Sequence, residues 1–389
     1  MLSCMTKINK IKICHICDRI TGQADGVFTH LISLLKNLDE TKFEQIVIFQ
    51  GGEIIENKLK KIEIKYFIVP ELKKRFSIKS LIKIYKILKN ESVDIIHAHL
   101  IKPYIISGLL NIYLRKILIF NYHGIFISSI YHNSIERFIL NIFHFIIVYS
   151  RSIQIAIVPS QQSKVLLTSE TKIFPRIEVY YNGFSNKDYN GLNIELEKEL
   201  NEIKSKYFLA GIVARHEIEK RIDISLNLLK RLTEDNINVF FVYFGDGPLE
   251  EEMKLLAQKL SVNKNCRFYG YVKDAPLYFD YFDAILFTSD WEGFPLTIWE
   301  SMASGVPIIS TDVGGIKEII EKEKCGVTYP KGDINSAKKI IEYLIKKPEV
   351  LKEMGNNGKV AIKTKYSIQN FISFFENLYT NILNENNSQ

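Results

Sequence analysis

Short apolar runs alternate with longer amphipathic segments along almost the whole chain. This alternation is typical of βαβ units built around parallel sheets. Because each half of the chain repeats the same plan, we predict an α/β protein with two doubly wound domains. The predicted strands are 10–17, 44–49, 94–97, 117–121, 154–158 and 177–180 in the first half, and 207–213, 238–244, 267–269, 284–287, 307–310 and 326–329 in the second half.

The weakest and most polar stretch between the two halves contains the run NGFSNKDYNG, which is rich in turn residues. We therefore predict a first domain at 1–187, a linker at 188–206 and a second domain at 207–365. The aromatic-rich segment 366–389 predicts a C-terminal helix, packing back on the first domain, and a tail. Two such domains direct the carboxyl ends of their strands toward a shared cleft, the expected place for a ligand.

Composition adds a charge asymmetry to this outline. The chain has 389 residues, of which 47% are hydrophobic and 24% charged, values typical of a globular protein. The net charge of +7 conceals an uneven distribution: residues 1–190 hold 26 basic and 15 acidic residues, and the rest holds 25 basic and 29 acidic ones. An excess of positive charge in the first half points to an anionic partner there.

Several classes of protein are disfavoured by the sequence. The N-terminal residues lack the apolar core of a secretory signal, so we expect a cytoplasmic chain. The most apolar stretches, 105–114 and 138–148, are shorter than a spanning helix requires. The basic half lacks the aromatic interleaving of a nucleic-acid-binding protein, so we expect no nucleic-acid partner. An NAD-linked oxidoreductase is disfavoured because no G-x-G-x-x-G follows the first strand.

Two pairs of residues have the spacing of metal ligands. Cys14 and Cys17 lie three apart on a predicted strand and therefore point to opposite faces. His97 and His99 lie two apart at a strand end and could share a metal, but the sequence identifies no third ligand. We interpret the cysteines as core residues and the histidines as packing or cleft-lining residues, and we predict no metal site.

The most informative segment is SDWEGFPLTIWESMASGVP, residues 289–307. Pro295 suits the first turn of a helix, and the backbone N–H groups of Leu296 and Thr297 at that helix start can bind a phosphate. Glu292 precedes the helix and Glu300 lies more than one turn inside it. These two carboxylates can therefore reach the hydroxyls of different parts of one elongated ligand.

Cations to balance a bound phosphate follow the strand 207–213. Arg215 and Lys220 stand in the run GIVARHEIEK, at the cleft edge of the predicted sheet. An arginine can hold a diphosphate in a bidentate fork, and a lysine adds a compact charge. Together with the two glutamates, they predict a site for a diphosphate that carries a sugar and a ribose.

These motifs carry a resemblance to a known family. EGFPLTIWESMASGVPIISTDVGG, with glutamates eight positions apart, resembles the E-x7-E signature of the retaining GT-B glycosyltransferases of family 4, also called glycosyl transferases group 1. GIVARHEIEK and VYFGDGPLEEEMKLLAQKL are similar to further family segments in the second half, and VYYNGF is similar to the family's Asn-Gly segment before the linker. DGVFTHLISLL, DIIHAH and YHG are similar to family segments in the first half. The resemblance implies two facing Rossmann-like domains.

The resemblance also implies roles for individual residues. Arg215 and Lys220 are expected to bind the donor diphosphate, Glu292 to contact the transferred sugar, and His123 to approach that sugar from the first domain. These four are the predicted catalytic residues. The predicted donor-binding residues are Gly26, Arg215, Lys220, Glu292, Gly293, Phe294, Leu296, Thr297 and Glu300. Gly22 is the other candidate for the loop glycine that faces the phosphates.

The implied reaction moves a hexosyl unit from a nucleotide diphosphate sugar, expected to be a UDP-sugar, to a hydroxyl of a glycan acceptor. Family members are thought to retain the anomeric configuration by front-face attack, in which the leaving diphosphate helps to deprotonate the acceptor. With two cations at the phosphates and no D-x-D motif, we expect no obligatory metal or other cofactor. The alternatives are a GT-B nucleotide-sugar epimerase, a phosphorylase and a non-catalytic nucleotide-sugar-binding protein.

Much of the positive charge of the first half of the chain lies in the segment 72–89. Lys79, Lys83 and Lys86 share one face of a predicted helix, which is by itself most simply a solvated surface. Combined with the resemblance to enzymes that act on lipid-linked acceptors, this face predicts peripheral binding to an anionic membrane. The expected location is the inner face of the cell membrane, and the expected process is surface polysaccharide synthesis.

Overall fold

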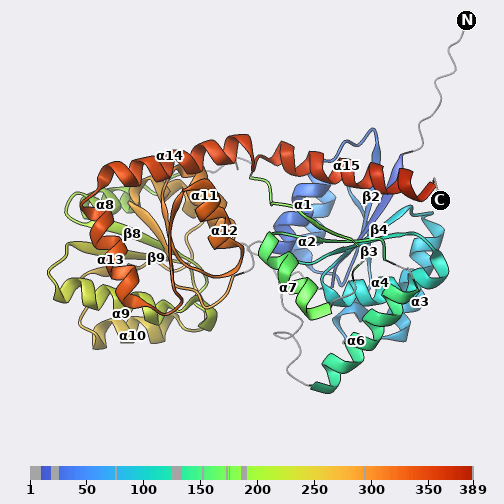
Figure 1. Cartoon of the computed structure of the whole chain (residues 1–389), viewed down its shortest axis with the longest axis horizontal. Helices are drawn as coiled ribbons and strands as arrows, with labels where there is room; N and C mark the ends of the chain where they lie inside the picture. Colours follow the sequence, from blue (N-terminus) through green and yellow to red (C-terminus); the bar gives the residue numbers. More distant parts are fainter. Residues whose placement is uncertain are drawn as a thin grey trace, which may run out of the picture. The chain divides into compact units, whose positions relative to one another are not determined.

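The computed structural model describes residues 10–18, 26–74, 77–123, 134–150, 153–171, 174, 176–184, 191–292 and 295–387. The chain forms two compact units (Figure 1): unit 1 contains Met1–Gly183 and Ile368–Gln389, and unit 2 contains Phe184–Ser367. Each unit has a central parallel sheet, which confirms the predicted α/β doubly wound architecture.

Unit 1 has a seven-stranded sheet with the order β3-β2-β1-β4-β5-β6-β7. Its inner strands β4, β5 and β6 are buried along their whole length, as expected for a parallel sheet covered by helices on each side. The strands are β1 (Ile11–Ile16), β2 (Phe43–Phe49), β3 (Lys65–Ile68), β4 (Ile95–His99), β5 (Ile117–Asn121), β6 (Ile155–Val158) and β7 (Ile177–Val179).

Two helical layers enclose this sheet. One face packs against α3, α4, α6 and α7, and the other against α1, α2 and α15. The helices are α1 (Gly26–Asn37), α2 (Glu53–Lys61), the short 3-10 helix η1 (Pro70–Lys73), α3 (Ile78–Asn90), α4 (Ile101–Leu114), α6 (Ser134–Tyr149), α7 (Gln161–Thr171) and α15 (Ile368–Asn387).

Helix α15, the last element of the chain, belongs to the core of unit 1. Phe371, Phe375 and Tyr379 recur at intervals of four residues on one helix face and are buried. They pack with the apolar residues of β4 and β5 that point to the same side of the sheet. The C-terminal segment thereby completes the first unit.

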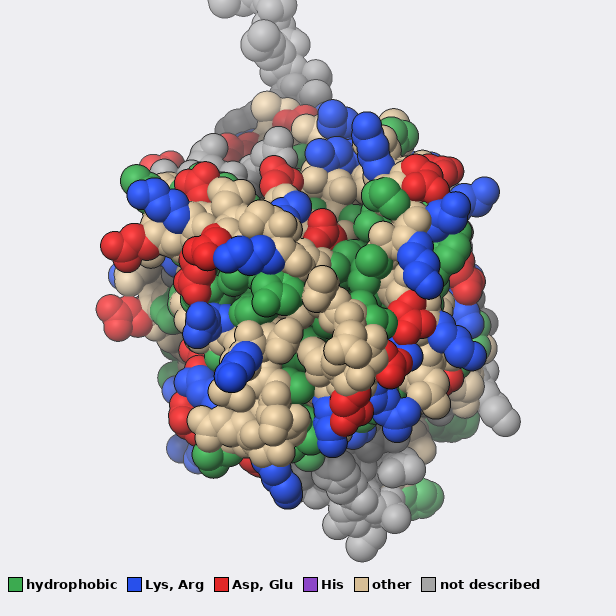
Figure 2. All heavy atoms as spheres, turned by 90° about the vertical axis from the view of Figure 1, so that its left-hand side faces the viewer, with side chains coloured by type: hydrophobic (Ala, Val, Ile, Leu, Met, Phe, Trp, Pro, Cys, Tyr) green, Lys and Arg blue, Asp and Glu red, His purple; other side chains and the backbone are tan. Residues whose placement is uncertain are grey.

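Unit 2 has a six-stranded sheet with the order β10-β9-β8-β11-β12-β13. Its elements, in chain order, are α8 (Ile194–Lys204), β8 (Phe208–Val213), η2 (Ile218–Lys220), α9 (Ile222–Glu234), β9 (Val239–Phe244), α10 (Glu250–Lys259), β10 (Cys266–Phe268), η3 (Ala275–Tyr281), β11 (Ala284–Phe287), α11 (Leu296–Ser304), β12 (Ile308–Thr311), α12 (Gly314–Glu323), β13 (Gly326–Tyr329), α13 (Ile334–Ile345) and α14 (Pro348–Thr364). On the face of unit 2 that Figure 2 shows, acidic and basic side chains are interspersed.

Every predicted strand is present, but three details differ from the sequence analysis. The edge strand β3 was not predicted, because its four residues are only half-buried or exposed and lack an apolar run. The predicted linker 188–206 contains helix α8, which Asn193 caps and which buries Leu196 and Leu200 in unit 2. Pro295 is the residue before α11 rather than its first residue, because its ψ of 135° is extended.

Within the described part of the chain, no helix is both long and apolar enough to cross a membrane. The longest, α15, has twenty residues and is amphipathic.

Candidate active site

The candidate site of unit 2 lies where the sheet changes direction. Strand β8 pairs with β9 on one side and with β11 on the other, so the chain progresses outward from β8 in both directions. Ligands of doubly wound sheets bind outside the carboxyl ends of the strands at such a point. The predicted cations follow β8 and the predicted glutamates follow β11, so the fold brings both groups to this edge.

Lys220 and Glu292 form an ion pair at this edge, with 2.8 Å between Nζ and Oε2. The Lys220 side chain is 20% exposed and that of Glu292 only 6%, so water screens the pair poorly. The Ser289 hydroxyl donates to the other carboxylate oxygen of Glu292 at 2.7 Å. Glu292 therefore holds Lys220 in place, a task that the sequence analysis did not assign to it.

The two loops that carry this pair are also joined through their backbones. The Thr288 hydroxyl donates to the carbonyl oxygens of Lys220 and Arg221, each at 3.0 Å. The Asp290 N–H donates to the Glu219 carbonyl at 2.8 Å. The guanidinium of Arg221 binds Asp223 and Asp290, which raises the pKa of Arg221. The geometry at Lys220 is thus fixed by several independent bonds.

Arg215 is the most exposed of the predicted site residues that the structure describes in unit 2. Its side chain is 59% exposed, and its Nη2 lies 2.9 Å from Oε1 of Glu217. Burial and the adjacent Glu219 raise the pKa of the Glu217 carboxyl. A guanidinium has five N–H donors, so Arg215 retains donors for a diphosphate beside its bond to Glu217.

The Gly-Asp-Gly-Pro turn, residues 245–248, supports the loop with Arg215. A Cβ at Gly245 would lie 2.0 Å from the Ala214 carbonyl oxygen, and one at Gly247 would lie 2.6 Å from the His216 carbonyl oxygen. The His216 N–H donates to the Asp246 carbonyl at 2.7 Å. Both glycines are therefore required, because the backbone of this turn approaches the backbone of residues 214–216 closely. A single sequence does not show such a contact.

The start of α11 lies beside the same loops. The Thr297 hydroxyl is 3.5 Å from the carbonyl oxygen of Val213, the last residue of β8. Leu296 and Thr297 provide the first amides of the helix, and Glu300 lies half-buried one turn further on. Gly293 and Phe294 lie outside the described residues, as does Gly22.

Helix α11 is held by close contact with α14. A Cβ at Gly355 would lie 2.0 Å from the Gly305 carbonyl oxygen, and one at Gly358 would lie 3.2 Å from the Met302 Cα. Trp299 packs against Tyr366 with 4.6 Å between ring centroids. This packing fixes the direction in which the start of α11 presents its amides.

In unit 1, the two predicted residues occupy the edge at the carboxyl ends of β1, β4 and β5. Gly26 is the first residue of α1, and a Cβ added there would meet nothing within 4 Å. His123 follows β5, and its Nε2 lies 3.1 Å from Nδ1 of His99. Burial lowers the pKa of His123 well below the usual value of a histidine.

His99 belongs to a group of five histidines in unit 1, of which four are buried and His123 is half-buried. The members are His15, His30, His97, His99 and His123. His30 is fixed by hydrogen bonds with the side chains of Asn182 and Asn121, both at 3.0 Å. From the sequence we interpreted His97 and His99 as packing or cleft-lining residues, because no third metal ligand could be identified. In the structure His15 lies beside both.

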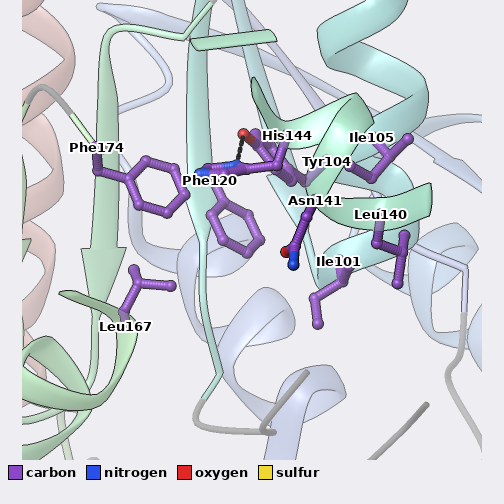
Figure 3. A pocket seen from close by; sticks show the side chains of 9 residues that line it. All are labelled: Ile101, Tyr104, Ile105, Phe120, Leu140, Asn141, His144, Leu167 and Phe174. Atoms are coloured by element: carbon purple, nitrogen blue, oxygen red, sulfur yellow. Dashed lines mark hydrogen bonds between the residues drawn. The ribbon is translucent and has the colours of Figure 1, made fainter. Parts of the chain in front are cut away.

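A small cavity in unit 1 is separate from these groups. It has a volume of about 20 Å³ and is lined by the residues that Figure 3 labels. Within its lining, Nδ1 of His144 and the Tyr104 hydroxyl are 2.8 Å apart. The remaining lining is almost entirely apolar, so the cavity is a packing defect of about one water molecule's size rather than a substrate pocket.

Comparison with known families agrees with this fold. Residues 193–361 match the family described as glycosyl transferases group 1, and residues 24–186 match glycosyltransferase family 4. The chain therefore belongs to the family 4 glycosyltransferases of GT-B type, and it is a glycosyltransferase.

Two curated relatives and one solved structure are similar to this chain over most of its length. The UDP-Gal:α-D-GlcNAc-diphosphoundecaprenol α-1,3-galactosyltransferase of Escherichia coli is 24% identical over 393 residues, covering 96% of this chain and 98% of that protein. The capsular polysaccharide biosynthesis glycosyltransferase CapM of Staphylococcus aureus is 24% identical over 316 residues, covering 79% and 82%. Anabaena HepE, crystallised with UDP, superposes with a TM-score of 0.78 at 19% identity, covering 95% of this chain and all of HepE.

Proposed function

We propose that this glycosyltransferase moves a hexosyl unit from a UDP-sugar to a hydroxyl of a lipid-linked glycan, with retention of the anomeric configuration. The observation that carries the proposal is the poorly screened Lys220–Glu292 pair at the junction of β8 and β11, beside the start of α11. A lysine held in this way presents a fixed cation to a diphosphate, which is what the departure of a nucleoside diphosphate requires.

The side chains at this edge have the capacity for that task. The ammonium of Lys220 has three donors, of which Glu292 takes one. Arg215 and the first amides of α11 supply further donors. In the reaction, the acceptor oxygen bonds to the anomeric carbon, the bond from that carbon to the phosphate oxygen breaks, and the acceptor proton passes to the leaving diphosphate. Arg215 and Lys220 stabilise the charge on this leaving group, so the transfer needs no divalent metal.

The choice of donor and acceptor rests on the relatives. HepE was crystallised with UDP, and the E. coli relative is named for a UDP-sugar donor and a diphosphoundecaprenol-linked acceptor. The S. aureus relative is named for capsular polysaccharide biosynthesis. We extend these features to this chain, and propose a role in the assembly of a surface polysaccharide on the inner face of the cell membrane.

A thermal-shift panel of UDP-, GDP- and ADP-sugars tests the donor. A ligand at 100 times its Kd stabilises the folded state by about 2.7 kcal/mol. For a domain of this size we expect the unfolding midpoint to rise by roughly 5–10 °C with a UDP-sugar. The shift should disappear in Lys220→Met and persist in Lys338→Met, a lysine of similar exposure on α13. Stabilisation by none of the nucleotide sugars would contradict the proposed site.

The proposed membrane contact is supported by two helices of unit 1. On α3, Lys79, Lys83 and Lys86 are exposed, while Ile84 and Leu88 are buried on the opposite side. Lys83 is paired with Glu71 on η1, and the other two lysines enlarge the positive face.

Helix α6 adds an apolar stripe in the same unit. Phe138, Ile142, Phe145 and Tyr149 recur at helical spacing and are exposed. Helix α4 contacts both α6 and α3, so the three helices form one side of unit 1 (Figure 1). Exposed apolar side chains beside lysines are typical of a surface that binds the interface of an anionic bilayer.

Flotation with vesicles tests this contact. Each lysine near an anionic surface contributes about 1 kcal/mol. We expect the triple change Lys79→Glu, Lys83→Glu and Lys86→Glu to lower partitioning onto phosphatidylglycerol vesicles by about 100-fold or more. The same three charge reversals at the exposed Lys346, Lys352 and Lys363 of unit 2 serve as the control. Wild-type binding that changes neither with salt concentration nor with the fraction of anionic lipid would contradict the proposal.

A further inference from the structure

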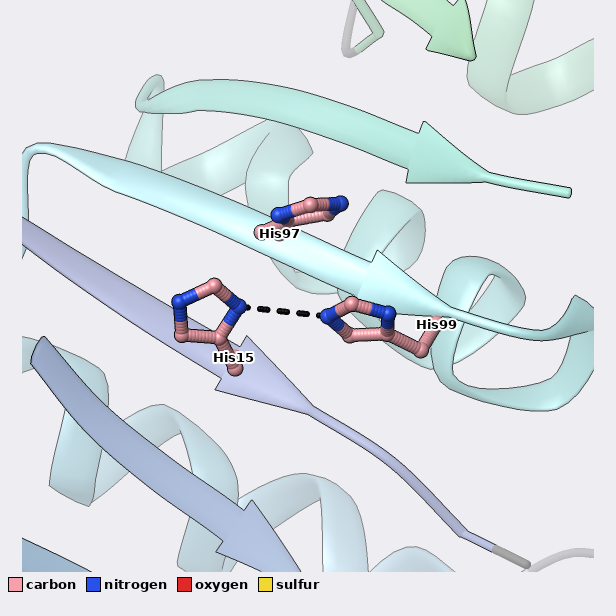
Figure 4. A group of neighbouring side chains, drawn as sticks. All are labelled: His15, His97 and His99. Atoms are coloured by element: carbon pink, nitrogen blue, oxygen red, sulfur yellow. Dashed lines mark hydrogen bonds between the residues drawn. The ribbon is translucent and has the colours of Figure 1, made fainter. Parts of the chain in front are cut away.

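The histidines of β1 and β4 form a compact group inside unit 1. Strands β1 and β4 pair in parallel with His15 opposite His97, and His99 follows two residues later on the same face. All three side chains have no exposed surface. Figure 4 shows the rings together beside the two strands. Two imidazoles two apart on one strand and a third on its neighbour are an arrangement that can converge on one ion.

The spacing of the rings fits such an ion. The ring centroid of His15 lies 5.1 Å from that of His97 and 5.4 Å from that of His99. The rings of His97 and His99 are stacked, with 4.3 Å between centroids and 26° between ring planes, so an ion bound to both requires one ring to tilt. Three imidazoles on a tetrahedral zinc, with Zn–N of about 2.0–2.1 Å, have ring centres roughly 5 Å apart and ligand nitrogens roughly 3.3 Å apart. Nδ1 of His15 and Nε2 of His99 are already 3.1 Å apart, and one nitrogen of each of the three rings lies within 4.8 Å of the others.

The outer nitrogens of two of these histidines are already held as metal ligands require. Nδ1 of His97 lies 2.8 Å from the Tyr379 hydroxyl, and Nδ1 of His99 lies 3.1 Å from Nε2 of His123. Such second bonds orient a ligating imidazole and fix the nitrogen that carries its proton. They leave Nε2 of His97 without a partner in the described part of the chain, whereas Nε2 of His99 shares a hydrogen bond with Nδ1 of His15 that a bound ion would replace.

Two ring nitrogens in the group lack a partner. Nε2 of His15 and Nε2 of His97 are buried and have no hydrogen-bond partner among the described residues. A buried polar atom without a partner lowers the stability of the fold by about 1–3 kcal/mol. We therefore expect a bound group to provide the missing partner. An ion on Nε2 of His97 and Nδ1 of His15 would give Nε2 of His97 a partner and would leave the proton of His15 on Nε2, for donation to Gln45. The Gln45 carboxamide oxygen is itself buried and unpartnered among these residues.

The chemistry of the donors selects the kind of ion. The group has only imidazole nitrogens, which suit zinc and its transition-metal neighbours, whereas Mg²⁺ and Ca²⁺ require oxygen ligands.

We propose that His15, His97 and His99 form a buried binding site for a divalent transition-metal ion, with Zn²⁺ as the ion that the donors fit best. The ion joins β1 to β4. Through Tyr379 it also fixes α15 on the sheet, and through His99 it orients His123. This proposal does not depend on the proposed donor or acceptor, because its tests measure metal binding.

The test uses the tag-free full-length protein, unfolded with a chelator and refolded with Zn²⁺ or Co²⁺, because a site without exposed surface is loaded during folding. After removal of free metal, we expect one metal ion per chain by elemental analysis. The cobalt form should show the visible absorption of Co²⁺ bound by imidazole nitrogens.

Variants locate the site. His97→Gln and His15→Gln should each lower the affinity for Co²⁺ by about 100-fold or more, since each loses a ligand. His144→Gln, which changes a buried histidine outside the group, should leave metal content and spectrum unchanged. Wild-type protein that refolds without metal and shows no cobalt spectrum would overturn the proposal. Equal binding by wild type and both ligand variants would overturn it as well. If neither variant folds, the metal content and the cobalt spectrum of the wild-type protein test the proposal by themselves.

Discussion

Replacement of Lys220 by methionine is expected to lower kcat for sugar transfer by about 10²- to 10³-fold, the usual effect of removing one preorganised donor to a developing charge. Methionine keeps the length of the side chain and removes its charge. The residual rate then comes from Arg215 and the amides of α11. The measurement is release of nucleoside diphosphate at saturating donor and acceptor.

A stability control separates this effect from misfolding. Lys220→Met leaves the Glu292 carboxylate, whose side chain is 6% exposed, without its cation, at an expected cost of about 3 kcal/mol. The double variant Lys220→Met/Glu292→Gln removes both charges and should recover most of the stability but none of the activity. Lys338→Met, which breaks the pairs with Asp235 and Glu342, should keep full activity. Wild-type rates in Lys220→Met would refute the assigned role.

Gly245→Ala is expected to damage both stability and donor binding. The new Cβ would lie 2.0 Å from the Ala214 carbonyl oxygen, and the φ of +131° is unfavourable for alanine. Overpacking and backbone strain together should cost about 3 kcal/mol, which lowers the unfolding midpoint by roughly 6–12 °C. Because the Ala214 backbone leads directly into Arg215, KM for the donor should rise.

Gly332→Ala provides the matched control for this change. Gly332 also has a positive φ, of +74°, but nothing lies within 4 Å of its added Cβ. It therefore shows the cost of backbone strain without the steric contact. A midpoint for Gly245→Ala equal to that of Gly332→Ala, with an unchanged KM, would contradict the support that we assign to the Gly-Asp-Gly-Pro turn.

Much of the fold was predictable because apolar periodicity specifies buried strands and helices directly. The strands and the C-terminal helix follow from that pattern. Strand β3 does not, since an edge strand with half-exposed residues has no apolar run to detect. Helix α8 was hidden by the turn residues that precede it, although Leu196 and Leu200 have the spacing of a buried helix face.

The candidate site was predictable as a set of residues but not as a set of contacts. The spacing within 289–307 indicated Glu292 and Glu300, yet the bond between Lys220 and Glu292 joins residues 72 positions apart and depends on the pairing of β8 with β11. Likewise, His15 lies opposite His97 only through the register of β1 and β4. Periodicity places residues on a face of a strand, but it does not give the register between strands.

The most direct test of the proposed reaction is ¹H NMR of the protein with a UDP-sugar and a short-chain polyprenyl-diphosphate-linked N-acetylglucosamine. We expect UDP release to depend on the acceptor and one glycoside to form for each UDP released. The new glycosidic bond should have the anomeric configuration of the donor. Consumption or epimerisation of the UDP-sugar at the same rate without acceptor, or a product of inverted configuration, would contradict it.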